Sequence, residues 1–244
     1  MVVTPSQQAA EVVYPSSDGA PLAETSVHID AIINAVVALR QYLEGQQAIV
    51  LADQFLYYAQ GYPKLRVAPD IMVIRDVAPG PRDNYKIWEE GAVPSVVFEI
   101  TSEGTQHYDL EHKKNLYEQL EVKEYWLFDP KSEWIPHKLK GFRLIEGMYL
   151  SITNGRSEPL QLRLEVEDAL IAFYRENTGE KLYAPDDLVQ ALQNEVQARQ
   201  QAEQRAEQER QRAEQERQRA EIAEARLGEL EEKLRSHGID PNDP

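Results

Sequence analysis

Apolar side chains recur at helical spacing in the first part of the chain. They repeat every three or four positions, at Ile32, Val36, Leu39 and Leu43, and the pattern stops shortly before a glycine. Repetition at these intervals places the apolar side chains on one face of a helix. The pattern therefore predicts a helix over about residues 26–44.

Short apolar runs bounded by turn residues predict strands further along the chain. Residues 48–52 and 54–59 are apolar and aromatic, and residues 125–129 form a similar run that ends before a proline. Residues 69–74 and 94–100 are apolar at almost every position except for one carboxylate each. Runs of this kind are typical of strands buried on both faces of a sheet.

A second helix is predicted over about residues 106–120. Leu110, Lys113, Tyr117 and Leu120 follow one another at steps of three and four residues, so they share one helical face. Lys113 is the one cation on this otherwise apolar and aromatic face. We therefore expect its ammonium group to have a buried partner.

The elements together predict an α/β protein with a mixed central sheet. The 69–74 and 94–100 strands are expected near the centre of the sheet, and the two helices are expected to flank it. Residues 131–175 contain several glycine and asparagine turn signals, which predict a small antiparallel addition to the domain.

The C-terminal part of the chain has a different composition. The seven-residue unit RAEQERQ occurs twice in residues 205–218, which predicts one continuous charged helix over 186–236. We divide the rest into a partly ordered arm, 1–23, a folded domain, 24–185, and a disordered C-terminus, 237–244.

The heptad positions of the tail leave two possibilities open. One seam runs from Leu188 to Leu234, but Ala, Glu and Arg occupy its central positions and bury little apolar surface. A solvated single helix and a coiled-coil homodimer are both consistent with this pattern. We expect a homodimer.

Composition restricts the location and the chemistry of the protein. Cysteine is absent, which excludes thiolate metal sites and cysteine nucleophiles and fits a reducing compartment, so the cytoplasm is expected. The sequence has neither a leader peptide at its start nor an apolar run long enough to span a membrane. We expect no membrane association.

The net charge of −16 is unusual for a nucleic-acid-binding protein. Residues 187–244 hold 9 Lys and Arg against 14 Asp and Glu, so residues 1–186 hold 17 against 28 and carry −11. The folded part is therefore itself acidic. This balance suits a site rich in carboxylates and gives no support to tight nonspecific binding of DNA.

Asp70 and Glu99 are the candidate metal ligands. A carboxylate within an apolar strand costs several kcal/mol unless it is paired, hydrogen-bonded or bound to a metal. If the two strands are neighbours, the side chains can converge and offer the oxygen ligands that Mg²⁺ or Mn²⁺ prefers. The alternative is that each acid lies at a strand end, where water or a backbone amide satisfies it.

Lys113 is the candidate catalytic cation. Its helix begins shortly after the Glu99 strand, so its ammonium could reach both acids, position a water molecule and stabilise charge on a phosphate oxygen. The alternative is a side chain paired with Asp109 one turn earlier. Lys114 is a neighbouring candidate, for which the alternative is a solvated helix face.

Four segments, in this order, carry a family resemblance. They are RDNYKIWEEG at 82–91, FEITS at 98–102, Asp109 with Lys113 and Tyr117, and EYWLFDP at 124–130. Together they resemble the bacterial Uma-type restriction endonuclease family, a branch of the PD-(D/E)XK nuclease superfamily. The resemblance covers about residues 24–184 and includes the heptad tail.

The resemblance implies a restriction-endonuclease-like fold and a set of catalytic residues. Asp70 would be the metal-binding aspartate and Glu99 the second acid, with Mg²⁺ or Mn²⁺ as the cofactor and DNA as the substrate. The superfamily places its lysine two residues after that acid, where this chain has Thr101. Lys113 occupies the position that the lysine takes in this branch. Glu24, or alternatively His28, resembles the polar residue that opens the first helix.

Two functions from different classes follow. The first is a metal-dependent endonuclease that hydrolyses phosphodiester bonds of DNA. The second is a nuclease-fold protein with little catalysis that acts as a binding or scaffold module through its helical tail. The sequence has no nucleophile elbow, phosphate-binding glycine loop or H-E-x-x-H pair, so other common hydrolytic sites are disfavoured.

Overall fold

The computed structural model describes residues 12–19, 24–102, 104–105 and 107–236. The chain divides into two compact units at Pro185 and Asp186. Most of the predicted N-terminal arm, residues 1–11 and 20–23, lies outside the described residues, as does the predicted disordered C-terminus, 237–244. No helix in the described ranges combines the length and apolar character that crossing a bilayer requires.

A six-stranded mixed sheet forms the centre of the first unit, in the order β1-β4-β6-β7-β8-β9. Only β6 and β7 run parallel to each other. The strands are β1 (Ala48–Ala52), β4 (Ile71–Arg75), β6 (Val96–Ile100), β7 (Glu124–Phe128), β8 (Leu139–Ile145) and β9 (Met148–Ile152). The predicted α/β class with a mixed central sheet is confirmed.

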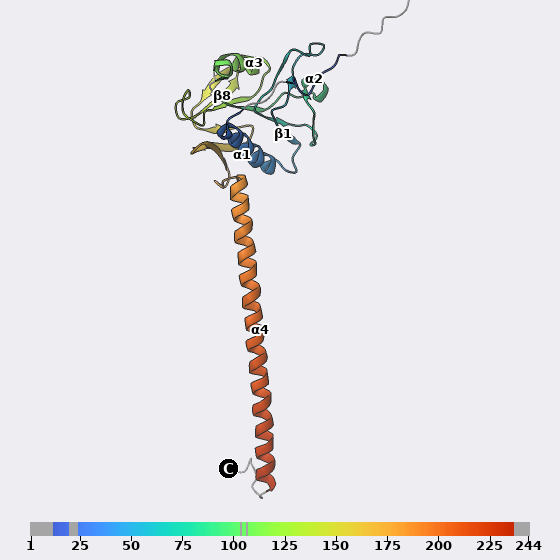
Figure 1. Cartoon of the computed structure of the whole chain (residues 1–244), viewed down its shortest axis with the longest axis vertical. Helices are drawn as coiled ribbons and strands as arrows, with labels where there is room; N and C mark the ends of the chain where they lie inside the picture. Colours follow the sequence, from blue (N-terminus) through green and yellow to red (C-terminus); the bar gives the residue numbers. More distant parts are fainter. Residues whose placement is uncertain (1–11, 20–23, 103, 106, 237–244) are drawn as a thin grey trace, which may run out of the picture. The chain divides into compact units, whose positions relative to one another are not determined.

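Helices cover the two faces of this sheet (Figure 1). The helix α1 packs on one face, and a π-helical turn continued by α3 packs on the other. The helices are α1 (Ser26–Tyr42), α2 (Ile87–Glu90), the π-helical turn η1 (Tyr108–Lys113), α3 (Lys114–Gln119) and, in the second unit, α4 (Pro185–Ser236). The second predicted helix is thus partly wrong, since its first half is π-helical.

Two small sheets complete the first unit. One, in the order β10-β11-β12, packs beside α1, and the other, in the order β3-β2-β5, packs on the opposite face of the central sheet. Their strands are β2 (Leu56–Tyr57), β3 (Arg66–Val67), β5 (Tyr85–Lys86), β10 (Arg156–Ser157), β11 (Leu162–Glu167) and β12 (Leu170–Arg175). Residues 131–175 are therefore no single addition, because β8 and β9 extend the central sheet.

The alternation of side chains along β6 decides where each residue points. Phe98 and Ile100 belong to the core under α1, whereas Val97 belongs to the core on the opposite face. Because side chains on a strand alternate with a period of two, Glu99 points to the same face as Val97, toward η1 and α3. The fold therefore places Glu99 under the helical segment that carries Lys113.

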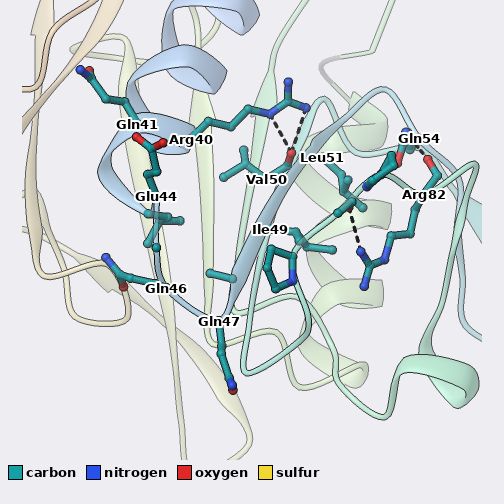
Figure 2. A pocket seen from close by; sticks show the side chains of 16 residues that line it. Arg40, Gln41, Glu44, Gln46, Gln47, Ile49, Val50, Leu51, Gln54 and Arg82 are labelled. Carbon is teal, nitrogen blue, oxygen red and sulfur yellow. Dashed lines mark hydrogen bonds between the residues drawn. The ribbon is translucent and has the colours of Figure 1, made fainter.

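The edge strand β1 borders a pocket with a volume of about 830 Å³. Figure 2 shows the Arg40 guanidinium bonded to the backbone carbonyl of Val50, at 3.1 Å from Nε and 3.0 Å from Nη2. None of the sequence-predicted site residues lines this pocket.

Gly141 allows β8 to pass close to the indole of Trp126. A Cβ atom at position 141 would lie 2.5 to 2.8 Å from three ring carbons of Trp126, which is itself buried. We predict that Gly141→Ala lowers the free energy of unfolding by about 2 kcal/mol, because the rigid ring must move within a packed core. Urea unfolding measures this change. Ser151→Ala, at an exposed position of the adjacent strand β9, is the control and should change it by less than about 0.5 kcal/mol.

Candidate active site

The two predicted acids meet where β4 begins and β6 ends. These strands pair antiparallel with Ile71 opposite Phe98, which brings the residues before Ile71 and after Phe98 together. The backbone N–H of Asp70 donates to Glu99 Oε2 at 3.4 Å, and Asp70 Oδ2 accepts from the backbone N–H of Ile100 at 2.5 Å. Asp70 precedes β4 rather than lying within it, and its side chain is 17% exposed.

Glu99 is completely buried, and its carboxylate has two side-chain donors. Lys113 Nζ lies 2.7 Å from Oε2, and the hydroxyl of Tyr117 lies 2.7 Å from Oε1. Burial raises the pKa of Glu99 to about 8 even though Lys113 acts in the opposite direction. The proximity of Asp70 and Asp109 also raises this pKa. The site therefore gathers more acidic groups than one ammonium group balances, and this crowding favours the protonated form of Glu99.

Lys113 contacts one of the two predicted metal ligands, Glu99, and also Asp109, the partner that the alternative interpretation gave it. Besides Glu99, its Nζ lies 3.0 Å from Oδ1 of Asp109, which is one turn earlier and also buried. Burial lowers the pKa of Lys113, but Glu99 and Asp109 together raise it above its ordinary value, so the side chain stays cationic at neutral pH. Lys114 points elsewhere, with its Nζ 5.0 Å from the centre of the Phe142 ring.

The start of α1 contributes His28 from its first turn, and Glu24, which precedes the N-cap, reaches the cluster through His28. The α1 N-cap Thr25 accepts from the backbone N–H of His28 at 3.4 Å, which fixes the first turn. His28 Nε2 lies 3.7 Å from Asp70 Oδ1, and its Nδ1 lies 3.6 Å from Glu24 Oε2. Burial lowers the pKa of His28, but Asp70, Glu24 and Asp53 raise it by more. The structure thus brings both residues into the cluster, with His28 beside Asp70.

Asp53 is a member of this cluster that the sequence analysis missed. It follows β1 with a φ of 50°, and its backbone N–H lies within hydrogen-bonding distance of the carbonyls of Pro69 and Asp70, at 3.2 and 3.3 Å. Burial and the charge of Asp70 raise its pKa to about 6. An acid directly after an apolar strand was the available signal, but only the pairing of β1 with β4 places it next to Asp70.

Thr101 stands where the superfamily pattern has its lysine, and it is part of the sheet instead. Its hydroxyl donates to the carbonyl of Phe128 at 3.2 Å, and its backbone N–H donates to the same oxygen at 2.7 Å. Thr101 is buried. It therefore ties the end of β6 to β7, and the cation of the cluster comes from Lys113.

The donor set fits Mg²⁺ or Mn²⁺. Asp70 and Glu99 supply carboxylate oxygens from adjacent strands, and the like charges that raise the pKa values of Glu99 and Asp53 are those that a divalent cation would neutralise. Within the described ranges no three acidic or histidine side chains form a ready-made metal cage. Mg²⁺ needs no such cage, because it is commonly held by one or two carboxylates together with water and substrate phosphates.

A pocket of about 450 Å³ opens beside the acidic cluster. Glu24, Thr25 and His28 line one side, and the segments that follow β6 and β7 line the other. Parallel strands end at the same edge of a sheet, and ligands of α/β folds commonly bind outside such ends. This pocket, rather than the larger one along β1, adjoins the candidate site.

Comparison with known proteins identifies the family. The sequence matches the model of the Uma2 family, described as "Putative restriction endonuclease", over residues 9–173. The chain belongs to the Uma2 family. This match confirms the resemblance seen in the sequence. The matched range contains every residue of the cluster described above.

This Uma2 chain has a similar protein among solved structures but no match among curated proteins. Among solved structures, it is similar to one described as a "putative nuclease belonging to DUF820" from Anabaena variabilis, with a TM-score of 0.45 and 13% sequence identity. The likeness covers 61% of this chain and 82% of the other. No curated protein matches the sequence.

The raised pKa values predict how the stability of the metal-free Uma2 domain depends on pH. The folded protein holds a proton on Glu99 up to about pH 8, whereas an unfolded glutamate loses it near its ordinary value of 4.5. Stability from this group is therefore fully present below about pH 4.5 and is lost as the pH rises through about 8. We expect the free energy of unfolding in EDTA to fall by up to about 1.4 kcal/mol per pH unit for this group.

Urea unfolding between pH 5 and pH 8 checks this prediction. Glu99→Gln removes the titrating group. The free energy of unfolding of this variant should therefore depend less on pH than that of the wild type across this range. Parallel curves for the two proteins would contradict the assignment.

Proposed function

We propose that this protein is a Mg²⁺-dependent endonuclease that hydrolyses phosphodiester bonds of DNA. One observation carries the proposal: in a chain of the Uma2 family, Glu99 Oε2 accepts from both the backbone N–H of Asp70 and the ammonium of Lys113, so residues from three separate segments lie together. The match to a family described as restriction endonucleases supports a nuclease and DNA as its substrate. It gives no support to the alternative of a scaffold without catalysis.

Asp70 and Glu99 are the residues that would hold the metal. Bound there, Mg²⁺ would act as a Lewis acid on a phosphate oxygen and lower the pKa of a coordinated water molecule. Oε2 of Glu99 faces Asp70, while Tyr117 holds Oε1 in place. The hydrogen bond from Ile100 N–H fixes Asp70 in the same way. Both ligands are therefore oriented before any substrate arrives.

Lys113 acts as a cation in this proposal. Because Glu99 and Asp109 raise its pKa, Lys113 keeps its proton at neutral pH and cannot serve as the base that takes a proton from water. Its ammonium can instead donate hydrogen bonds to the attacking water and to a phosphate oxygen as negative charge develops there. Asp109 is a positioning residue, since it holds Lys113 from the other side at 3.0 Å.

Substitution at the cluster tests the proposal. We expect Asp70→Asn and Lys113→Met each to lower the rate of Mg²⁺-dependent DNA cleavage at least about 100-fold, because each removes a charge that acts on the reacting phosphate. Cleavage of plasmid and oligonucleotide DNA with Mg²⁺, Mn²⁺ or EDTA provides the measurement.

Lys114→Met is the matched control, because it removes the adjacent lysine, which lies over Phe142 and not at the carboxylates. This variant should cleave at close to the wild-type rate. Cleavage that persists at full rate in EDTA, or in Asp70→Asn, would refute the mechanism.

Helix α4 is proposed to join two copies of the chain. Its side chains are mostly exposed, and the apolar residues near its C-terminal end include Leu227 and Leu230, which are 59% and 58% exposed. Both lie on the heptad seam. In a parallel coiled-coil dimer these side chains would be covered by the second copy.

Sedimentation of the full chain tests this proposal. We expect the wild type to sediment as a dimer and the double variant Leu227→Lys, Leu230→Lys as a monomer. The two lysines on the seam of one helix would repel the same lysines on the helix of the second copy. Glu232→Lys makes the same change of net charge off the seam and should remain dimeric. Equal sedimentation of all three proteins would rule out pairing through this seam.

A further inference from the structure

Three segments bound the pocket beside the acidic cluster, and each is tied to a candidate catalytic residue or to the sheet. The chain at the start of α1 provides Glu24, just before the helix, and His28, in its first turn, and His28 lies 3.7 Å from Asp70. The segment after β6 begins at Thr101, two residues beyond Glu99. The segment after β7 provides Trp134. A group held in this pocket is therefore adjacent to the acids.

Trp134 differs from the other two tryptophans. Trp126 is buried and donates its indole N–H to Glu124 at 3.1 Å, and Trp88 contacts Tyr14 with ring centres 5.1 Å apart. Trp134 is only half-buried. Among the described residues, no aromatic ring packs on Trp134 and no acceptor binds its indole N–H. Core packing thus accounts for Trp126 but leaves Trp134 at the pocket without a comparable role.

Asp129 holds the segment that carries Trp134. This acid is completely buried, and its carboxylate accepts from three backbone N–H groups, of Lys131, Trp134 and Ile135, at 3.1, 2.6 and 2.9 Å. A buried carboxylate satisfied in this way fixes the backbone around it. The indole of Trp134 is therefore presented on a rigid loop, which reduces the entropy lost when a ligand binds to it.

The charges around the pocket favour a nucleobase over a phosphate. Glu24 and Glu133 line it against one lysine, Lys131, and one histidine, His28, which already lies beside Asp70 and Glu24, whereas phosphate sites rely on several cations. An indole offers a face on which any base can stack, and a carboxylate accepts from the amino group of a base such as cytosine. The volume of about 450 Å³ lies in the range of pockets that hold small organic groups.

Only an unpaired base can use such a pocket. In a duplex both faces of each base are covered by its neighbours, so a base must be single-stranded or flipped out before it can stack on a side chain. Stacking needs few cations. It therefore suits a chain with a net charge of −16, which cannot rely on phosphate contacts for affinity.

We propose that this pocket binds one unpaired nucleobase of the substrate, stacked on Trp134, beside the phosphate that is cleaved. This inference rests on the proposed nuclease function and narrows its substrate to DNA with an unpaired nucleotide at the cleavage position, such as a single strand, a flap or a mismatch.

Binding of a fluorescent oligonucleotide tests the inference apart from catalysis. The probe is a single-stranded oligonucleotide that contains 2-aminopurine, whose fluorescence is quenched when the base stacks, measured with the full chain in EDTA and in Ca²⁺. We expect quenching with the wild type and a Kd about tenfold higher for Trp134→Leu, since one stacked base is lost. Trp134→Phe keeps an aromatic face and should restore most of the affinity.

Trp88→Leu is the matched control, because Trp88 is also half-buried but lies outside the pocket, and it should bind as the wild type does. A competition experiment that uses only the wild-type protein does not depend on whether the variants fold. An oligonucleotide with one abasic position at the cleavage point should compete about tenfold less well than the intact strand.

The outcomes separate this inference from the proposed function. If the wild type cleaves duplex DNA as fast as single strands and Trp134→Leu leaves binding and KM unchanged, the base pocket is refuted while the nuclease stands. If Asp70→Asn cleaves like the wild type, the nuclease mechanism is refuted whatever Trp134 does. Support requires a higher KM with little change in kcat for Trp134→Leu, together with its weaker binding of the probe.

Discussion

The contact between the buried carboxylate of Glu99 and the ammonium of Lys113 is the interaction on which the site depends. A carboxyl group taken out of water is costly to ionise, which raises the pKa of Glu99 to about 8, and its oxygens are tolerated there only where donors surround them. Lys113 and Tyr117 supply those donors from the segment that covers this face. The position of η1 and α3 over β6 is thus coupled to the ionisation of one side chain.

An irregular turn in the covering segment carries part of this interaction. Asp109 and Lys113 lie within η1, and Tyr117 lies in α3, so the change from π-helical to α-helical geometry falls between the residues that hold Glu99. Single π-helical turns within helices occur frequently at functional sites. Here the π-helical turn η1 carries Lys113 and Asp109, and the α-helix α3 carries the hydroxyl of Tyr117.

Much of this arrangement can be predicted from the sequence, because burying a charge leaves a clear signature. Asp70, Glu99 and Lys113 each stand out as charged residues in apolar surroundings, but only the pairing of β4 with β6, which the sequence leaves open, makes the first two neighbours. Asp53 carries no such signature, since it follows a strand and belongs to the cluster only through the pairing of β1 with β4. The extension of the sheet by β8 and β9 and the π-helical turn also depend on tertiary packing, which local patterns do not encode.

The hydrogen bonds from the guanidinium of Arg40 to the carbonyl of Val50 bear on the tendency of the protein to aggregate, because β1 is an edge strand of the central sheet. A sheet that stops at an open strand offers its unused backbone groups to any other chain, and this is a common start of aggregation. A bulky cation seated on one of those groups both occupies the acceptor and repels the matching cation of a second molecule. One side chain of α1 thereby helps to keep the flank of the sheet from templating growth between copies.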